Sequence, residues 1–96
     1  MFPLLHRRRN KPALRLRRGV RTAVLDDGLA VIDARGGVLH LNPTARLILS
    51  TLLAGGGIAT TAAQLTEQFG LPESSAITDV TAVVDELTRR NVARWR

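Results

Sequence analysis

Short apolar segments separated by turn residues occupy the first half of the chain and predict an antiparallel sheet. The apolar segments are residues 20–25, 29–33 and 38–42. The turns between them, residues 26–28 and 34–37, contain Asp and Gly, and Gly supplies the positive φ that tight hairpins need. Two tight hairpins place the three strands side by side in chain order.

Helical periodicity follows directly after the last of these segments. The first predicted helix spans residues 43–53 and ends before the three glycines at 55–57. Asn42 is well suited to cap this helix, and Pro43 opens it with its φ already near the helical value. The apolar stripe expected to face the core comprises Leu47, Ile48, Leu52 and Leu53.

Two more helices fit the remaining length. The second begins with Thr60 or Thr61 as its cap and ends at residues 70–72, and the third starts at residue 73 or 74. Asn91 is expected to end the third helix, because Asn tolerates the left-handed conformation best after Gly. The expected core stripes are Ala62, Leu65 and Phe69 in the second helix, and Ile77, Val80, Val84 and Leu87 in the third.

Three strands of about five residues cannot bury themselves, so the helices must cover one face of the sheet. The predicted fold is α+β and winged-helix-like, with a three-stranded antiparallel sheet followed by three helices. Residues 92–96 form a short tail in which Trp95 is expected to cover part of the core.

The net charge of +6 is concentrated at the N-terminus. Residues 1–18 contain seven Arg or Lys and no acid, whereas residues 19–96 contain seven Arg and eight Asp or Glu. Like-charge blocks are typically solvated, so we expect residues 1–18 to be a basic disordered tail and residues 19–96 to be the folded domain. Contact of the tail with a membrane, nucleic acid or partner remains open.

The composition argues against metal sites and against the common catalytic groups. There is no Cys, and His6 and His40 are isolated, so no metal site is expected. Asp26-Asp27 lies in a hairpin turn, where Asp is favoured for local hydrogen bonding. No catalytic group or cofactor site emerges, so we expect a non-enzymatic protein. The sequence shows no signal peptide or membrane span, which predicts a cytoplasmic location.

Two binding modes remain. A helix-turn-helix would present the start of the third helix to DNA, but Glu73 and Asp79 there would repel phosphates. Alternatively, a peptide adds as a strand to an edge of the sheet. Arg21 blunts the first strand as an edge, whereas residues 38–41 contain no Lys, Arg or Pro, so the third strand is the more open edge. A winged-helix nucleic-acid binder using the Arg tail is the alternative, and a scaffold that only contacts a partner enzyme is a third possibility.

Several motifs resemble the PqqD-like family of leader-peptide recognition elements. They are Asp-Gly-Leu-Ala-Val-Ile-Asp at 27–33, Leu-Asn-Pro-Thr-Ala at 41–45, Asp-Val at 79–80 and Asp-Glu-Leu at 85–87. The resemblance covers residues 20–92, and the first two motifs are most similar to the stand-alone recognition proteins of lasso-peptide clusters.

The resemblance implies a non-catalytic adaptor without a cofactor. The leader segment of a ribosomally made precursor would add to the third strand, beside the third helix, and be presented to a leader protease and an ATP-dependent cyclase. No nucleic-acid partner is expected, and the oligomeric state stays open. Val80 and Leu87 also fit the core stripe, and Asp79 also suits the helix dipole. The implied peptide-binding residues are Val38, Leu39, His40, Leu41, Asp79, Val80, Val83, Glu86, Leu87 and Arg90.

Overall fold

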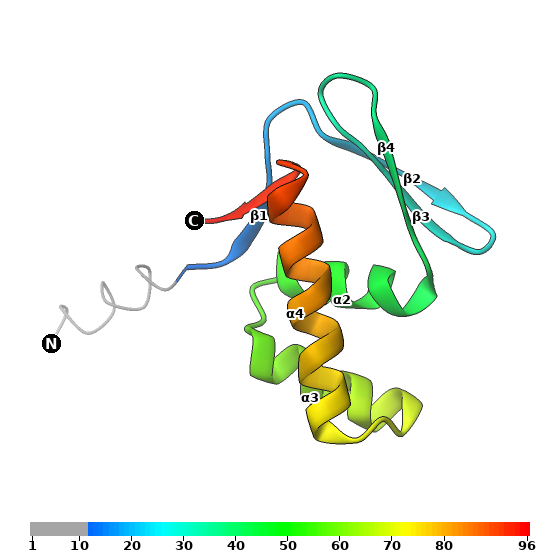
Figure 1. Cartoon of the computed structure of the whole chain (residues 1–96), viewed down its shortest axis with the longest axis vertical. Coiled ribbons are helices and arrows are strands. Elements are labelled where there is room, and N and C mark those ends of the chain that lie inside the picture. Colours follow the sequence, from blue (N-terminus) through cyan, green and yellow to red (C-terminus); the bar gives the residue numbers. More distant parts are fainter. Residues whose placement is uncertain (1–11) are drawn as a thin grey trace, which may run out of the picture.

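The computed structural model describes residues 12–96, and its central feature is the predicted three-stranded antiparallel sheet (Figure 1). Strands β2 (Arg21–Leu25), β3 (Gly28–Ile32) and β4 (Val38–Leu41) lie in the order β2-β3-β4. Three helices follow, so the α+β, winged-helix-like prediction is confirmed.

The hairpin between β3 and β4 is fixed by one carboxylate. Asp33 Oδ1 accepts hydrogen bonds from the backbone N–H groups of Arg35 and Gly37, each at 2.8 Å. Gly36 has φ 90°, a conformation that other residues rarely adopt. The turn therefore needs both the Asp and the Gly that the sequence supplies.

Helix α2 (Pro43–Leu53) has the predicted bounds. Asn42 Oδ1 accepts a hydrogen bond from the N–H of Ala45 at 2.8 Å, which confirms the cap. In Figure 1, α2 lies between the sheet and the other two helices, and it contacts β3, β4, α3 and α4. This helix is the element that joins the two halves of the domain.

Helix α3 (Ile58–Phe69) starts earlier than predicted. Gly57 precedes its first turn, and Thr61 lies inside the helix, where its hydroxyl donates to the carbonyl of Gly57 at 2.8 Å. Thr61 is completely buried, so this bond satisfies its hydroxyl within the core. The cap predicted at Thr60 or Thr61 is therefore wrong, and α3 relies on packing at its N-terminus.

Helix α4 (Glu73–Arg89) confirms the predicted start at residue 73. Asn91 follows it with φ 63°, the left-handed conformation expected of the end residue. The chain then turns back, and the N–H of Val92 donates to the carbonyl of Leu87 at 3.0 Å.

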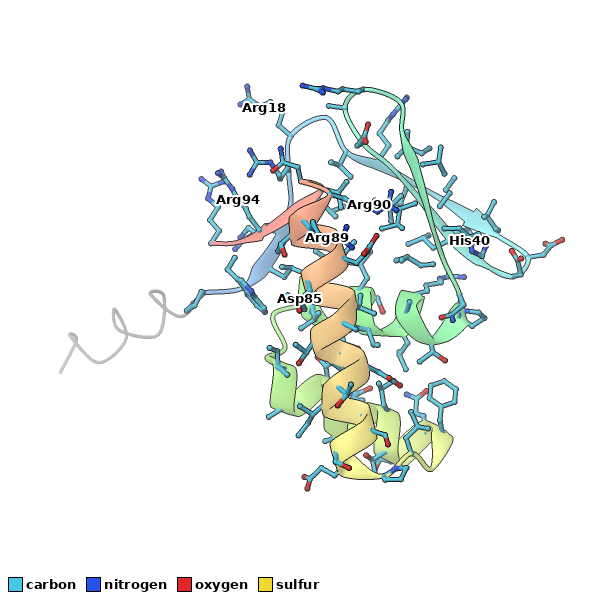
Figure 2. All side chains as sticks on the ribbon, in the orientation of Figure 1. Arg18, His40, Asp85, Arg89, Arg90 and Arg94 are labelled. Carbon is cyan, nitrogen blue, oxygen red and sulfur yellow. The ribbon has the colours of Figure 1, made fainter. Side chains whose placement is uncertain are left out.

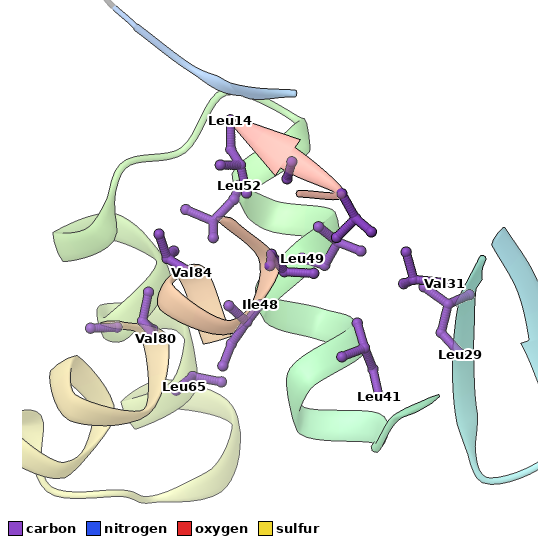
Figure 3. Packing of buried hydrophobic residues seen from close by; sticks show 14 of the residues in the cluster. Leu14, Leu29, Val31, Leu41, Ile48, Leu49, Leu52, Leu65, Val80 and Val84 are labelled. Carbon is purple, nitrogen blue, oxygen red and sulfur yellow. The ribbon is translucent and has the colours of Figure 1, made fainter. Parts of the chain in front are cut away.

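The core lies between α2, α3 and α4, and Leu29, Val31 and Leu41 extend it toward the sheet on one side of α2 (Figure 3). The predicted helical periods are confirmed, but three predicted stripe members are wrong because Leu53, Phe69 and Ile77 are each more than one third exposed. Ala76, one position before Ile77, is fully buried instead. The principal buried side chains are Leu14, Leu29, Val31, Leu41, Ile48, Leu49, Leu52, Leu65, Val80, Val84, Leu87 and Val92.

A second sheet was not predicted. Strand β1 (Leu14–Leu16) pairs antiparallel with β5 (Ala93–Trp95), which joins the two ends of the described chain. Leu14 is completely buried, so residues 14–16 belong to the fold and the predicted boundary of the basic tail at residue 18 is corrected. Trp95 is 38% exposed, whereas Ala93 on the same strand is buried in the core. Residues 1–11 of the predicted tail lie outside the described residues.

We predict that Leu14→Ala destabilises the protein by about 2 to 5 kcal/mol, because the truncation leaves a cavity in the core. Val24→Ala is the matched control: Val24 is also an aliphatic strand residue, but it is 68% exposed. Its truncation should cost about 0.5 kcal/mol or less. Urea unfolding measures both values, and equal small losses would show that β1 is not part of the cooperative fold.

Candidate functional site

Strand β4 and helix α4 do not contact each other directly. Both elements contact α2, yet no Cα atom of β4 lies within 8 Å of a Cα atom of α4. This separation exceeds the spacing of about 4.8 Å between paired strands. We use the word groove for the region between the free edge of β4 and the facing side of α4, with the start of α2 between them.

Two hollows mark the ends of this groove. The first has a volume of about 400 Å³ and lies between the start of α2 and the middle of α4. The second has a volume of about 240 Å³ and lies between the β3–β4 hairpin and the end of α4. The first is lined by Asn42, Thr44, Ala45, Ile48, Leu71, Asp79, Ala82 and Val83, and the second by Asp33, Ala34, Arg35, Arg90 and Asn91.

The free edge of β4 presents alternate backbone groups. The N–H of Asp33 donates to the carbonyl of Gly37 at 2.9 Å, and the hydrogen-bonded pairs of an antiparallel ladder recur at every second residue. Leu39, opposite Val31, therefore directs its backbone groups toward β3, as does Leu41. The backbone N–H and C=O groups of Val38 and His40 consequently point away from β3, toward the open edge.

The side chains of β4 alternate between the two faces of the sheet. Leu41 is buried and Leu39 is half-buried against the core, whereas Val38 and His40 are exposed on the other face of the sheet. His40 Nε2 lies 3.1 Å from Asp27 Oδ1, and this contact lowers the pKa of Asp27 through hydrogen bonding and charge. The four predicted strand residues are therefore together, but only two of their side chains face the helices.

On α4, the predicted residues fall on two adjacent faces. Val80 and Leu87 are completely buried, so they anchor α4 to the core and are not accessible to a ligand. Asp79 and Val83 line the first hollow, and Arg90 lines the second. Their spacing of four and seven residues places them on one side of the helix, about 16 Å from end to end.

Glu86 lies on this same side, between Val83 and Arg90, and is half-buried. Its carboxylate pairs with the guanidinium groups of both Arg89 and Arg90. The hydrogen bond from Arg90 is the main cause that lowers the pKa of Glu86. The pairing orients Arg90 at the end of the groove and leaves Asp79 as the unpaired carboxylate at the other end.

Sequence reasoning missed several residues of the first hollow. Thr44 and Ala45 stand at the start of α2, Leu71 precedes α4, and Ala82 lies beside Val83. The Leu-Asn-Pro-Thr-Ala motif at 41–45 did mark this place, but only as a junction between strand and helix.

The described residues offer no group of three or more His, Asp or Glu side chains that could hold a metal ion. Between residues 12 and 96, no helix is long and apolar enough to cross a membrane.

The fold and groove can now be compared with known proteins. The model of the family described as coenzyme PQQ synthesis protein D (PqqD) matches residues 22–93. The chain belongs to the PqqD family. No curated protein matches the chain.

Two solved structures are similar to this PqqD-family chain over most of its length. One is "Lasso peptide synthetase B1 complexed with the leader peptide", with 34% identity and a TM-score of 0.80, covering 85% of this chain and 98% of that one. The other is "TbiB1 in Complex with the TbiA(beta) Leader Peptide", with 15% identity and a TM-score of 0.75, covering 83% and 94%. At that lower identity, the second similarity shows the fold alone.

We predict that Asp33 stabilises the β3–β4 hairpin in a pH-dependent way. The N–H groups of Gly37 and Arg35 lower its pKa in the folded protein. Its stabilisation is therefore present above the ordinary aspartate pKa and is lost as the pH falls through the lowered value. The urea midpoints of Asp33→Ala and wild type should differ by a constant amount from about pH 7 to about pH 5, and should converge as the pH falls below about 4.

Asp33→Asn is the matched control, because it keeps an acceptor oxygen but cannot titrate in this range. The urea midpoint of Asp33→Asn should therefore fall less than that of the wild type when the pH is lowered, because residue 33 can no longer take up a proton. A difference between wild type and Asp33→Ala that stays constant even below about pH 4 would contradict the role of the charged carboxylate.

Proposed function

We propose that this chain binds the leader segment of a ribosomally synthesised precursor peptide, of the lasso-peptide class, as an added strand on β4. The free edge of β4, together with the two hollows along α4, carries this proposal. The 34% identical relative, whose structure is a complex with a leader peptide, supports it.

Main-chain pairing with Val38 and His40 would supply the affinity. An added strand would alternate its own side chains between the two faces of the sheet. Those on the inner face would meet Leu39 and the α4 surface formed by Asp79, Val83 and Glu86. Asp79 would pair with a Lys, an Arg or a backbone N–H of the leader, and Val83 would supply an apolar contact.

The resulting role is that of an adaptor without catalytic activity of its own. It would hold the leader and present the rest of the precursor to a separate leader protease and an ATP-dependent cyclase. A leader bound as a strand leaves the following segment extended and accessible to such enzymes. Because ribosomes make the precursor in the cytoplasm, the adaptor would meet it there.

The exposed carboxylates of α4 argue against the alternative of a nucleic-acid-binding protein. Its exposed surface carries Glu73, Asp79 and Asp85, so a recognition helix here would bring carboxylates to phosphates. The leader-binding role therefore explains the groove better than insertion of α4 into DNA.

We predict that a fluorescently labelled leader from the adjacent precursor gene binds the wild-type chain in an anisotropy titration. Val83→Arg should weaken this binding at least about tenfold, because it fills the middle of the groove with a charged side chain. Thr81→Arg is the control, since Thr81 is exposed on the opposite side of α4 and the same charge is introduced.

Circular dichroism and urea unfolding must show that both variants are folded. No leader binding by wild type at tens of micromolar would contradict the proposed function. Equal affinity for the folded Val83→Arg variant and wild type would instead contradict the assignment of the groove.

We further predict that Val38→Pro weakens leader binding about tenfold while Val38→Ala leaves it nearly unchanged. Pro removes the N–H that Val38 directs toward the open edge, and the β3 ladder does not use that N–H. Ala keeps the N–H and removes only a side chain that is 61% exposed. Equal loss in both variants would mean that the side chain, and not the strand edge, makes the contact.

A further inference from the structure

The two-stranded sheet of β1 and β5 carries a cluster of arginines that the leader groove does not use. Leu14 and Leu16 face the core from β1, so the residues between and after them face outward. Arg15 and Arg94 are register partners in this sheet, and Arg96 pairs with Ala13 through two backbone hydrogen bonds of 2.8 and 3.1 Å. Alternation therefore places Arg15, Arg94 and Arg96 on one outward face.

Arg17 and Arg18 extend this face beyond β1. Five arginines line a hollow of about 340 Å³ together with Leu16. We call these five residues the arginine surface: Arg15, Arg17, Arg18, Arg94 and Arg96. Figure 2 places Arg94 and His40 on opposite sides of α4, so the arginine surface and the strand edge of the groove face different directions.

The charge on this surface is uncompensated. Among residues 12–96, the ion pairs join His40 to Asp27 and Glu86 to Arg89 and Arg90, and none involves an arginine of this surface. Residues 1–11 add four more Arg or Lys and no Asp or Glu. The protein itself therefore supplies no side-chain carboxylate to neutralise the cluster.

The register makes this arrangement costly for the isolated chain. Arg15 and Arg94 stand directly opposite one another, and like charges at opposed positions of an antiparallel pair destabilise it. An oxyanion between the two guanidinium groups would convert this repulsion into charge-assisted hydrogen bonds. The geometry is thus suited to an anionic partner that arrives from outside.

We propose that the arginine surface docks an acidic segment of a partner protein, through carboxylates of Asp or Glu side chains. The surface spans only a few residue pairs, which is short for a nucleic-acid backbone track. Asp85 is exposed on α4 and Glu73 at its start, and these carboxylates would oppose an extended polyanion. Because β1 and β5 pair only with each other, each also keeps one unpaired edge suited to an extended protein segment.

The choice of a protein partner rests on the proposed adaptor function. An adaptor that holds a leader in one groove needs a second surface for the enzyme that processes the peptide. The arginine surface stays accessible when the groove is filled, so both partners can bind at once. Arg is also better matched than Lys to bidentate pairing with carboxylates at such an interface.

A labelled decaglutamate peptide is the first probe, titrated against the full 96-residue chain at physiological salt. We expect Arg15→Glu and Arg94→Glu to weaken its binding about tenfold each. Arg46→Glu is the matched control, because Arg46 is exposed on α2 and the change in net charge is identical. The Arg94→Glu variant also replaces a repulsive cross-strand pair with an attractive one, so its urea midpoint should not fall.

Equal loss of decaglutamate binding in Arg46→Glu and Arg94→Glu would overturn the proposal, because net charge alone would then govern the affinity. A 20-base-pair duplex DNA and vesicles of phosphatidylserine and phosphatidylcholine are titrated in parallel. Tighter binding of either than of decaglutamate, lost in Arg94→Glu but not in Arg46→Glu, would also overturn it in favour of that ligand.

Leader binding is measured on the same variants. Unchanged leader affinity in Arg15→Glu and Arg94→Glu, together with their loss of decaglutamate binding, supports two independent surfaces. Failure of the wild type to bind any leader would overturn the proposed function, whereas unchanged decaglutamate affinity in the two variants would overturn only the docking surface.

Discussion

The direct passage from β4 into α2 is the constraint on which the rest of the domain depends. Leu41 ends the strand buried in the core, and Asn42 caps the helix at the next position. Gly28 lies against this passage so closely that a Cβ there would stand 1.8 Å from the carbonyl oxygen of Leu41. No flexible linker separates strand from helix, so the direction of β4 is tied to that of α2. Since α2 also packs on α4, one rigid unit sets the width of the groove.

The sheet has two outer strands, β2 and β4, and only β4 lies against a helix. All five residues of β2 are exposed, and this strand contacts no helix. β4 continues into α2 and faces α4 across the groove. The sequence favoured the same edge for a different reason, namely that Arg21 blunts β2. Charge pattern and geometry therefore agree on the edge that is suited to an added strand.

Local signals explain what the sequence could predict. Asn42 and Pro43 define the start of α2, and Asn91 ends α4, because these residues act on their immediate neighbours. The backbone edge of β4 could also be predicted, since it follows from strand order and composition. The exact residues that face the core on each helix are harder to predict, because periodicity locates the apolar stripe only to within one position. Ala76 and Ile77 show this, as the tight packing of α3 on α4 selects the smaller residue for the core.

The second sheet depends on contacts between the two ends of the chain, which no local pattern reports. Leu14 and Leu16 alternate with Arg15 and Arg17, a period of two that is typical of a strand. Within a block of seven cations, however, the charge pattern favours a solvated tail. The hollow at the start of α2 was missed for a related reason, since Leu71 and Thr44 come together only after α3 has folded back.

The charged residues of the domain fall into two groups, one on the side of α4 that faces the groove and one around β1 and β5. In the proposed complex, main-chain pairing on β4 would be largely independent of sequence, so selectivity would come from the few side chains of α4 that face the groove. Asp79 and Arg90 stand at opposite ends of that face, and the Glu86 pair neutralises much of the charge between them. The excess of positive charge lies instead in residues 1–18, together with Arg94 and Arg96. The free strand edge and the excess of positive charge therefore lie on different parts of the same small domain.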